Sequence, residues 1–239
     1  LTWLERYIYR NSKVVMGQSQ EILTHVSQFT DVPKFVYRNL PRDSKPLAQM
    51  EIKDSNSKTV VYAGLLGFAQ GVFNICSEID FLELGIEFHI YGKGMEEDQI
   101  VRFIESNPSL PIYFHGSFKP SESNTILHKY HAALVPLANR IYGAVPSKIF
   151  ELIHLQIPIL YSGGGEGAEL VESRGLGFSC EPGNNDALSQ MLRQFADCEE
   201  SVLQGMRFSL LKAAKEEFDY ENQFKDFLSF VDENYSEGF

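Results

Sequence analysis

Two glycine-containing loops carry residues that could bind a phosphate. In the loop 64–71, Gly64 and Gly67 permit positive φ angles and a close approach of the backbone to an anion. In the loop 91–94, Lys93 follows an apolar run and could meet a diphosphate. The alternatives are a tight strand-to-helix turn for the glycines and a solvated side chain for the lysine. The first loop is not the G-x-G-x-x-G fingerprint, and no P-loop lysine follows it.

A third loop, 139–151, places a predicted helix start beside a positive charge. Pro146 suits the first turn of a helix, so Ser147 and Lys148 would offer free backbone N–H groups with the lysine charge beside them. Glu151 follows Lys148 by three residues and shares its helical face. The alternative is a surface Lys–Glu pair, worth roughly a few tenths of a kcal/mol.

The remaining candidates are weaker. Residues 162–169 form a Gly-rich turn from a strand into a helix, which indicates either the lip of a site or simple flexibility. None of the six histidines has H-E-x-x-H or another paired metal-ligand spacing. Only His115 follows a predicted strand end near the expected crevice, and a structural role accounts for it better. No Ser-His-Asp arrangement can be assembled, so the sequence identifies no catalytic residue and no metal site.

Composition and charge exclude several classes of protein. The 239 residues carry 21 basic and 32 acidic side chains, for a net charge of −11, which argues against nonspecific nucleic-acid binding. Three cysteines without C-x-x-C spacing indicate neither a disulfide framework nor a zinc site, and they favour a reduced cytoplasmic setting. No apolar run approaches the ~20 residues of a membrane span. The chain opens without a signal peptide or an initiator Met, so we expect a piece of a longer protein.

The elements that must position these loops read as an α/β domain. Short, almost continuously apolar runs alternate with helical periodicity over about residues 58–200, which predicts a doubly wound, Rossmann-like parallel sheet. The expected strands are 59–64, 87–92, 112–116, 132–136, 158–162 and 177–180. Ligands of such sheets bind at the carboxyl ends of the strands, and all four loops lie there.

The two ends of the chain read differently from its middle. Leu188, Met191, Leu192 and Phe195 repeat at helical spacing after a cap signal at 184–186, and Phe224, Phe227, Leu228 and Val231 repeat it in the last helix. Before the main domain we expect a helix (1–10), a strand (13–17), a helix (19–29), a strand (34–39) and a polar linker. About forty such residues cannot bury a core alone. They either dock on the next domain or close a domain whose beginning is missing, and we favour the second.

In their order, several of these segments resemble the donor-binding half of a retaining glycosyltransferase of family four. The matching segments are Tyr62-Ala63-Gly64, Ile90-Tyr91-Gly92-Lys93-Gly94, Phe114-His115-Gly116, Val135-Pro136, Val145-Pro146-Ser147-Lys148-Ile149-Phe150-Glu151, Pro158-Ile159-Leu160 and Gly165-Glu166-Gly167-Ala168-Glu169. The seven residues from Val145 are similar to the P-S-K-I-F/Y-E segment of bacterial surface-polysaccharide enzymes. Such enzymes have the GT-B fold of two Rossmann-like domains.

The resemblance covers essentially the whole chain and implies a division into parts. Residues 1–45 would close an N-terminal acceptor-type domain, of which about 150 preceding residues are absent. Residues 46–58 would be a linker, and 59–218 would bind the nucleotide-sugar donor. The helix in 219–239 would cross back and pack its apolar face on residues 1–39.

The resemblance also implies roles for single residues. Gly64, Gly67 and Gln70 would lie at the donor diphosphate, with Lys93 assisting, and Ser147 and Lys148 would cap its β-phosphate. Ser117 and Phe118 would lie near the base, and Glu151 would hold the ribose hydroxyls. The chain departs from the family at Leu65 and Gln70, where basic residues are common, and at Gly143, where the first acid of the E-x7-E motif would fall.

The implied function is transfer of a sugar, with retention, from a nucleotide-sugar that we expect to be UDP-linked. The acceptor would be a glycan or a lipid-linked glycan in polysaccharide, lipopolysaccharide or glycoconjugate synthesis. We expect no metal cofactor, a cytoplasmic location at the inner face of the membrane, and no activity of this fragment alone. Two alternatives are a non-catalytic nucleotide-sugar-binding subunit that needs a separate acceptor-domain chain, and a nucleotide-sugar epimerase. The epimerase would need crevice carboxylates and a histidine that the sequence does not identify.

Overall fold

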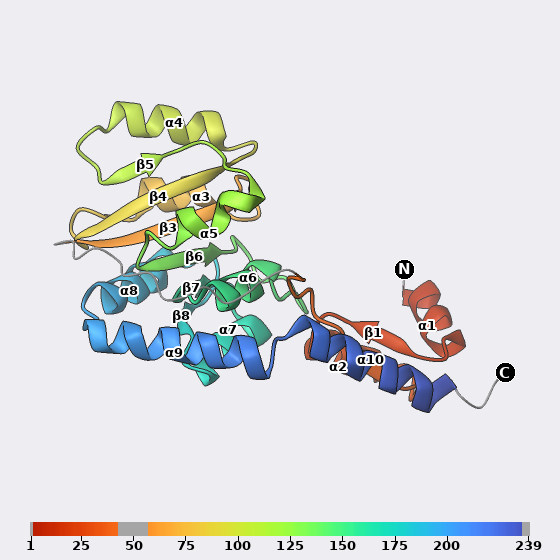
Figure 1. The fold of residues 1–239 in the computed structure, drawn as a ribbon. Helices are drawn as coiled ribbons and strands as arrows, with labels where there is room; N and C mark the ends of the chain where they lie inside the picture. Colours follow the sequence, from red (N-terminus) through yellow and green to blue (C-terminus); the bar gives the residue numbers. More distant parts are fainter. Residues whose placement is uncertain (1, 43–56, 236–239) are drawn as a thin grey trace.

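The structure, a computed structural model, describes residues 2–42 and 57–235, which form two lobes (Figure 1). The large lobe comprises residues 57–218 and contains a six-stranded parallel sheet. The small lobe combines residues 2–42 with the last helix and contains a two-stranded parallel sheet. The predicted linker, 46–58, lies almost entirely outside the described residues.

The sheet of the large lobe has the order β5-β4-β3-β6-β7-β8, and every neighbouring pair is parallel. Its strands are β3 (Lys58–Leu65), β4 (Ile86–Lys93), β5 (Ile112–Phe114), β6 (Ala132–Pro136), β7 (Ile159–Ser162) and β8 (Gly177–Cys180). The strand order reverses between β3 and β6. A doubly wound sheet binds its ligand at such a point of reversal, outside the carboxyl ends of the strands. The predicted fold class is therefore confirmed.

Helices cover both faces of this sheet (Figure 1). They are α3 (Val72–Glu78), α4 (Glu97–Ser106), the short η1 (Pro120–Glu122) with α5 (Ser123–Leu127), α6 (Ser147–Leu155), α7 (Gly165–Ser173), α8 (Asn185–Ala196) and α9 (Glu200–Glu216). The cap signal before α8 is correct, because the Asn184 side chain accepts a hydrogen bond from the Ala187 backbone N–H. Pro146 is the residue before α6 rather than its first helical residue, one position earlier than predicted.

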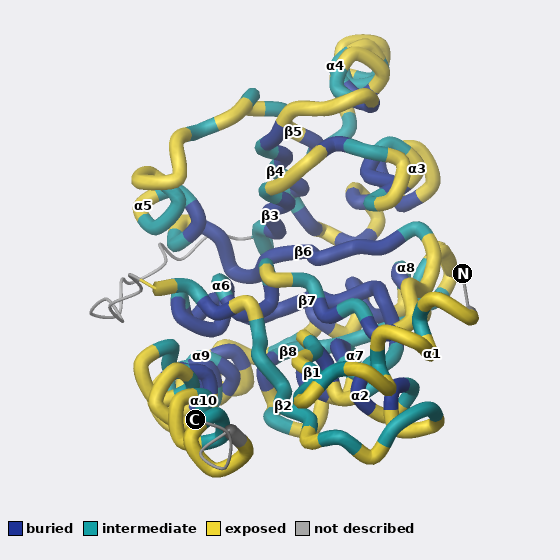
Figure 2. Tube along the Cα trace, turned by 90° about the vertical axis from the view of Figure 1, so that its right-hand side faces the viewer, coloured by how far each residue is buried: buried dark blue, intermediate teal, exposed yellow. Residues whose placement is uncertain are grey.

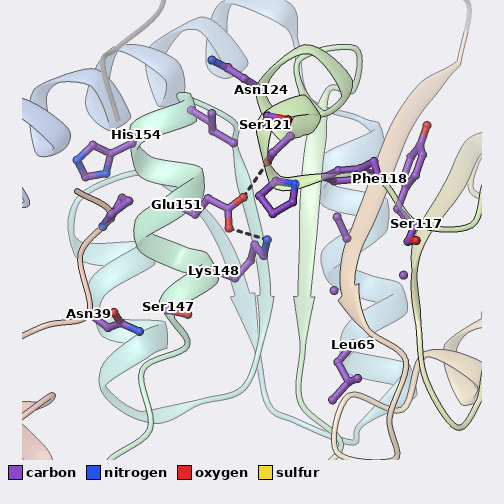
Figure 3. Close-up of a pocket in the computed structure, with 18 of the residues that line it drawn as sticks. Asn39, Leu65, Ser117, Phe118, Ser121, Asn124, Ser147, Lys148, Glu151 and His154 are labelled. Atoms are coloured by element: carbon purple, nitrogen blue, oxygen red, sulfur yellow. Dashed lines mark hydrogen bonds and ion pairs between the residues drawn. The ribbon is translucent and has the colours of Figure 1, made fainter. Parts of the chain in front are cut away.

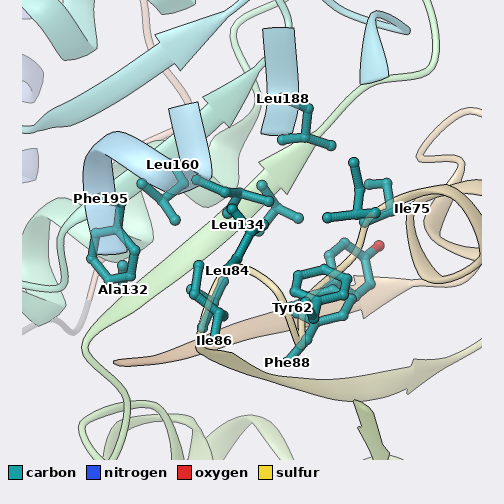
Figure 4. Packing of buried hydrophobic residues seen from close by; sticks show 14 of the residues in the cluster. Tyr62, Ile75, Leu84, Ile86, Phe88, Ala132, Leu134, Leu160, Leu188 and Phe195 are labelled. Atoms are coloured by element: carbon teal, nitrogen blue, oxygen red, sulfur yellow. The ribbon is translucent and has the colours of Figure 1, made fainter. Parts of the chain in front are cut away.

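The core consists of two apolar clusters, one on each face of the sheet. Val60 and Val61 are both fully buried, yet they belong to different clusters because successive strand residues point to opposite faces. Val60 belongs to a cluster with residues of α3, α4 and α8, whereas Val61 belongs to one with residues of α6 and α7. Figure 4 shows part of the first cluster, including Ile75 of α3 and Leu188 of α8. Figure 2 shows the same burial along β6 and β7, with exposed residues on the outer helices. Burial on both faces explains the uninterrupted apolar runs.

Two glycines bring the carboxyl ends of β3 and β4 unusually close together. A Cβ on Gly92 would lie 2.0 Å from the Gly64 carbonyl oxygen, and one on Gly94 would lie 2.2 Å from the Leu66 carbonyl oxygen. Neither position can carry a side chain unless the backbone moves. These glycines therefore set the close packing of the two loops that follow β3 and β4.

The small lobe is built from both ends of the chain. Its elements are α1 (Thr2–Asn11), β1 (Val15–Gly17), α2 (Gln20–Val26), β2 (Lys34–Val36) and α10 (Tyr220–Tyr235). The Phe227 ring packs on Phe35 and Tyr37, at centroid distances of 5.7 and 5.4 Å. The Gln223 side chain accepts a hydrogen bond from the Arg38 backbone N–H and donates one to the Arg38 carbonyl. The last helix thus lies on β2 and the residues after it.

The contact face of α10 differs in part from the sequence pattern. Phe227 contacts β2, whereas Phe224 and Leu228 remain 39% and 46% exposed. Phe230 supplies a further ring against Phe35, at 5.1 Å. A sheet of two short strands is narrow, so it covers only part of the apolar stripe that the periodicity defines.

Candidate functional site

A cavity of about 1160 Å³ opens at the carboxyl ends of β3 and β4, beside the start of α6 (Figure 3). Its wall includes the ends of both strands, the segment after β5, α5, α6 and residues 39–41 of the small lobe. Its volume is somewhat above the roughly 300–1,000 Å³ of typical small-molecule and cofactor sites, and it lies at the carboxyl ends of the strands, where doubly wound sheets bind their ligands.

The amino-terminal end of α6 supplies the anion-binding part of this wall. Pro146 is extended (φ −57°, ψ 130°), and its carbonyl accepts the first helical hydrogen bond, from Ile149 N–H at 3.0 Å. The Ser147 and Lys148 amides are therefore the free N–H groups of the helix start. The helix dipole and the Lys148 ammonium both place positive potential at this end.

Lys148 and Glu151 form an ion pair within the cavity wall. Lys148 Nζ lies 2.6 Å from Glu151 Oε2, and the Ser123 hydroxyl donates to Glu151 Oε1 at 2.9 Å. Figure 3 shows the Lys148 and Glu151 side chains turned toward each other. The two side chains of the pair are 31% and 35% exposed, so the pair is reachable from the cavity. Glu151 is thus held by two side chains, and one of them, Lys148, belongs to the first turn of α6.

An aromatic wall closes another side of the cavity. The Tyr91 ring meets Phe118 edge to face at 5.2 Å, and both rings line the cavity. The Tyr91 and Tyr130 hydroxyls are 2.8 Å apart, and burial together with this hydrogen bond raises the pKa of Tyr130 well above its ordinary value. Flat aromatic faces of this kind can stack on a nucleobase.

His115 supports this wall but does not line the cavity. Its ring stacks on Tyr91 at 4.6 Å, and its Nε2 lies 2.9 Å from His89 Nδ1. Burial lowers the pKa of both histidines. The structural interpretation of His115 therefore agrees with its contacts.

The structure brings most of the predicted site residues together. Those that line the cavity are Gly64, Lys93, Ser117, Phe118, Ser147, Lys148 and Glu151. Gly67 and Gln70 lie outside the lining and form the turn after β3, where the Gln70 N–H donates to the Gly67 carbonyl at 3.0 Å. Leu65, where the resemblance led us to expect a basic residue, lines the cavity and is 66% exposed.

Several lining residues were not predicted from the sequence. Asn39, Leu40 and Pro41 come from the small lobe, and His154 comes from the last turn of α6. Residues 39–41 gave no sequence signal beyond their place before the predicted polar linker. For His154 no sequence signal exists, because its place in the wall depends on how α6 is oriented.

The described residues contain neither a group of metal ligands nor a membrane-spanning helix. No group of three or more His, Cys, Asp and Glu side chains in the described ranges could hold a metal ion. None of the described helices is both long enough and apolar enough to cross a bilayer.

Comparison by sequence finds a glycosyltransferase relative. No family model matches the chain. A protein from Pseudomonas aeruginosa called "Probable glycosyltransferase WbjE" is 26% identical over 184 residues, which are 75% of this chain and 46% of that protein. The chain therefore spans about half the length of this curated relative.

Solved structures show the same fold. A TarM variant from S. aureus, in complex with Fondaparinux, alpha-GlcNAc-glycerol and UDP, matches 95% of this chain and 46% of its own, at a TM-score of 0.72 and 16% identity. Anabaena HepE in complex with UDP-glucose matches 97% of this chain and 67% of its own, at a TM-score of 0.73 and 14% identity. A glycosyltransferase from Rickettsia africae matches 96% of this chain and 66% of its own, at a TM-score of 0.77 and 14% identity. The described chain thus matches part of the GT-B fold of these glycosyltransferases and resembles their donor-binding half.

Proposed function

We propose that this chain binds the nucleotide-sugar donor of a glycosyltransferase, with UDP as the nucleotide. The observation that carries the proposal is the cavity itself, which combines a free helix start, a lysine and an aromatic wall at the carboxyl ends of the strands. These groups suit a diphosphate at one end and a base at the other. Complexes of the structural relatives TarM and HepE with UDP or UDP-glucose support the choice of nucleotide.

In this proposal each side chain acts on a stated part of the donor. The Ser147 and Lys148 amides and the Lys148 ammonium bind the diphosphate and stabilise it as the leaving group. Lys93, at the end of β4, adds a second positive charge. Glu151 accepts hydrogen bonds from the ribose hydroxyls, and the base lies against Phe118, with Ser117 at its edge.

The remaining parts of the proposal rest on the resemblance to family-four enzymes. We infer transfer with retention, in the synthesis of a surface polysaccharide, lipopolysaccharide or other glycoconjugate, on the cytoplasmic side of a membrane. We also infer that an acceptor-binding domain completes the enzyme, so the 239 residues alone should not turn over.

The test is ligand-dependent thermal stability together with calorimetry. Purified chain is titrated with UDP, GDP, ADP, UDP-glucose, UDP-galactose and UDP-N-acetylglucosamine. A ligand present at 100 times its dissociation constant should stabilise the folded state by about 2.7 kcal/mol. We expect UDP and one or more UDP-sugars to do so. A chain that responds to none of the six compounds has no donor site of the kind proposed.

A further inference from the structure

A cluster of polar groups joins the two lobes. It contains Ser19, Glu21 and Arg38 from the small lobe and Arg140, Gly143 and Glu166 from the large lobe, and we call it the inter-lobe cluster. None of these residues lines the donor cavity described above.

The first turn of α2 holds both backbone groups of Gly143. The Glu21 carboxylate accepts the Gly143 N–H at Oε2, at 2.8 Å, and Ser19 Oγ donates to the Gly143 carbonyl at 2.7 Å. Arg140 Nη2 donates to Glu21 Oε1 at 2.8 Å. A carboxylate from the small lobe is thereby fixed on the loop that follows β6.

Residue 143 itself cannot carry a side chain at this point. Its φ is +72°, and a Cβ there would lie 2.4 Å from Ile22 Cγ1. Since residue 143 cannot supply an acidic side chain of its own, the carboxylate next to its backbone is that of Glu21. It approaches from the opposite lobe.

Contacts from both lobes hold Glu21 in place. A Cβ on Gly165, at the start of α7, would lie 3.0 Å from Glu21 Oε1, so the positive end of that helix adjoins the carboxylate. Glu166 Oε2 accepts the Glu21 backbone N–H at 3.0 Å, and its Oε1 pairs with Arg38 at 2.6 Å. Glu21 thus has a fixed backbone as well as a fixed side chain.

One buried polar group near this carboxylate has no partner. The Tyr161 side chain is fully buried, and its hydroxyl forms no hydrogen bond within the described part of the chain. It lies under the Gly-rich turn, because a Cβ on Gly163 would be 2.2 Å from it. Burial, and after it the nearby Glu21 charge, raise the pKa of Tyr161 to about 12, so the hydroxyl keeps its proton.

The cluster adjoins the donor cavity at two points along the chain. Gly143 precedes Ser147, the first residue of α6, by four positions, and Ser147 lines the cavity. Arg38 precedes Asn39, which also lines it. A sugar attached to a diphosphate at the start of α6 would extend into the space between the lobes.

We propose that Glu21 is a specificity-determining residue that binds hydroxyl groups of the transferred sugar, so that the small lobe contributes to the donor site. The proposal rests on the function proposed above. A carboxylate offers about four lone-pair positions, of which Arg140 and Gly143 occupy two. The Glu21 side chain is 21% exposed, so the remaining positions are open to a ligand.

The test compares UDP with UDP-sugars by calorimetry on the full 239-residue chain. In Glu21→Gln we expect about tenfold weaker binding of the tightest UDP-sugar and less than a twofold change for UDP, since only the sugar meets the carboxylate. The control is Ser19→Ala, which keeps the carboxylate but removes the other hydrogen bond to Gly143 and the N-cap of α2, where Ser19 Oγ accepts the Ile22 N–H. It should leave the ratio of the two dissociation constants unchanged.

Each other outcome overturns the inference. Equal weakening of UDP and UDP-sugar in Glu21→Gln would mean that the cluster only holds the loop before α6, and no weakening would mean that Glu21 has no role in binding. Monodeoxy UDP-sugars on the unaltered chain test the same contact if the variant does not fold. At least one must bind about tenfold more weakly than its parent. An unaltered chain that does not bind UDP removes the proposed function first, and this inference with it.

Discussion

Replacing Lys148 by alanine is the most direct test of the diphosphate site. Lys148 Nζ already lies 2.6 Å from Glu151 Oε2, but an ammonium has three N–H donors, so two remain for phosphate oxygens. Lys148 therefore need not leave Glu151 when a diphosphate binds. The ion pair would then become a bridge between the carboxylate and the ligand.

The expected magnitude follows from comparing this contact with the ion pair alone. A charge-assisted hydrogen bond to phosphate contributes roughly 1.5–3 kcal/mol, or about ten- to a hundredfold in affinity. We expect the lower end, about tenfold, because Glu151 partly neutralises the lysine. As a half-exposed surface pair, Lys148 and Glu151 would contribute under about 1 kcal/mol to stability and nothing to binding.

The assay is calorimetric titration of Lys148→Ala with UDP and with uridine. UDP should weaken about tenfold while uridine changes little, because only UDP carries the diphosphate. Lys212→Ala is the matched control, since Lys212 forms an exposed pair with Glu216 on α9, and it should change neither affinity. Equal effects on UDP and uridine, or none on UDP, would refute the assignment of the diphosphate to α6.

Three further predictions concern stability and reactivity. Gly92→Ala should lower the free energy of unfolding by about 2–4 kcal/mol, because its Cβ would lie 2.0 Å from a backbone carbonyl oxygen of β3; urea denaturation measures this, with the unobstructed Gly205→Ala as control. Burial lowers the pKa of His131 below its ordinary 6.5, and its Nδ1 accepts the Thr59 N–H at 3.0 Å. The free energy of unfolding that this neutral histidine contributes should be complete above pH 6.5 and lost as the pH falls below that value. The free energy of unfolding of His131→Asn should therefore change less between about pH 7.5 and pH 5.5 than that of the unaltered chain. Burial raises the pKa of Cys76 to about 12, so a thiol reagent at about pH 8 should label it only after denaturation; labelling of the folded chain, mapped by mass spectrometry, would contradict this.

The large lobe was predictable because its local signals agree with its tertiary environment. All six strands occur where apolar runs were found, since burial on both faces requires such runs. Leu188 and Phe195 of α8 are buried as their spacing requires. In the small lobe the strands β1 and β2 are three residues each, shorter than predicted, because only a two-stranded sheet is there to pair with them.

The site was predictable only where the residues that would bind the ligand lie close together in the sequence. The start of α6 is such a place, because the proline, the lysine and the glutamate lie within one short segment. The inter-lobe cluster is the opposite case. Ser19 and Glu21 meet Gly143 across 124 and 122 residues of sequence, and no periodicity or motif connects them. Pairings of this kind depend on how the lobes are placed.

The return of α10 to the small lobe decides how the protein can be divided. The large lobe is one continuous stretch of sequence, whereas the small lobe needs both ends of the chain. A chain that begins after the linker but keeps residues 219–235 would retain α10 without its partner and expose Phe227 and Phe230 to solvent. An excised large lobe should therefore end near residue 218, and a protease cut in the linker alone should leave the two products bound to each other.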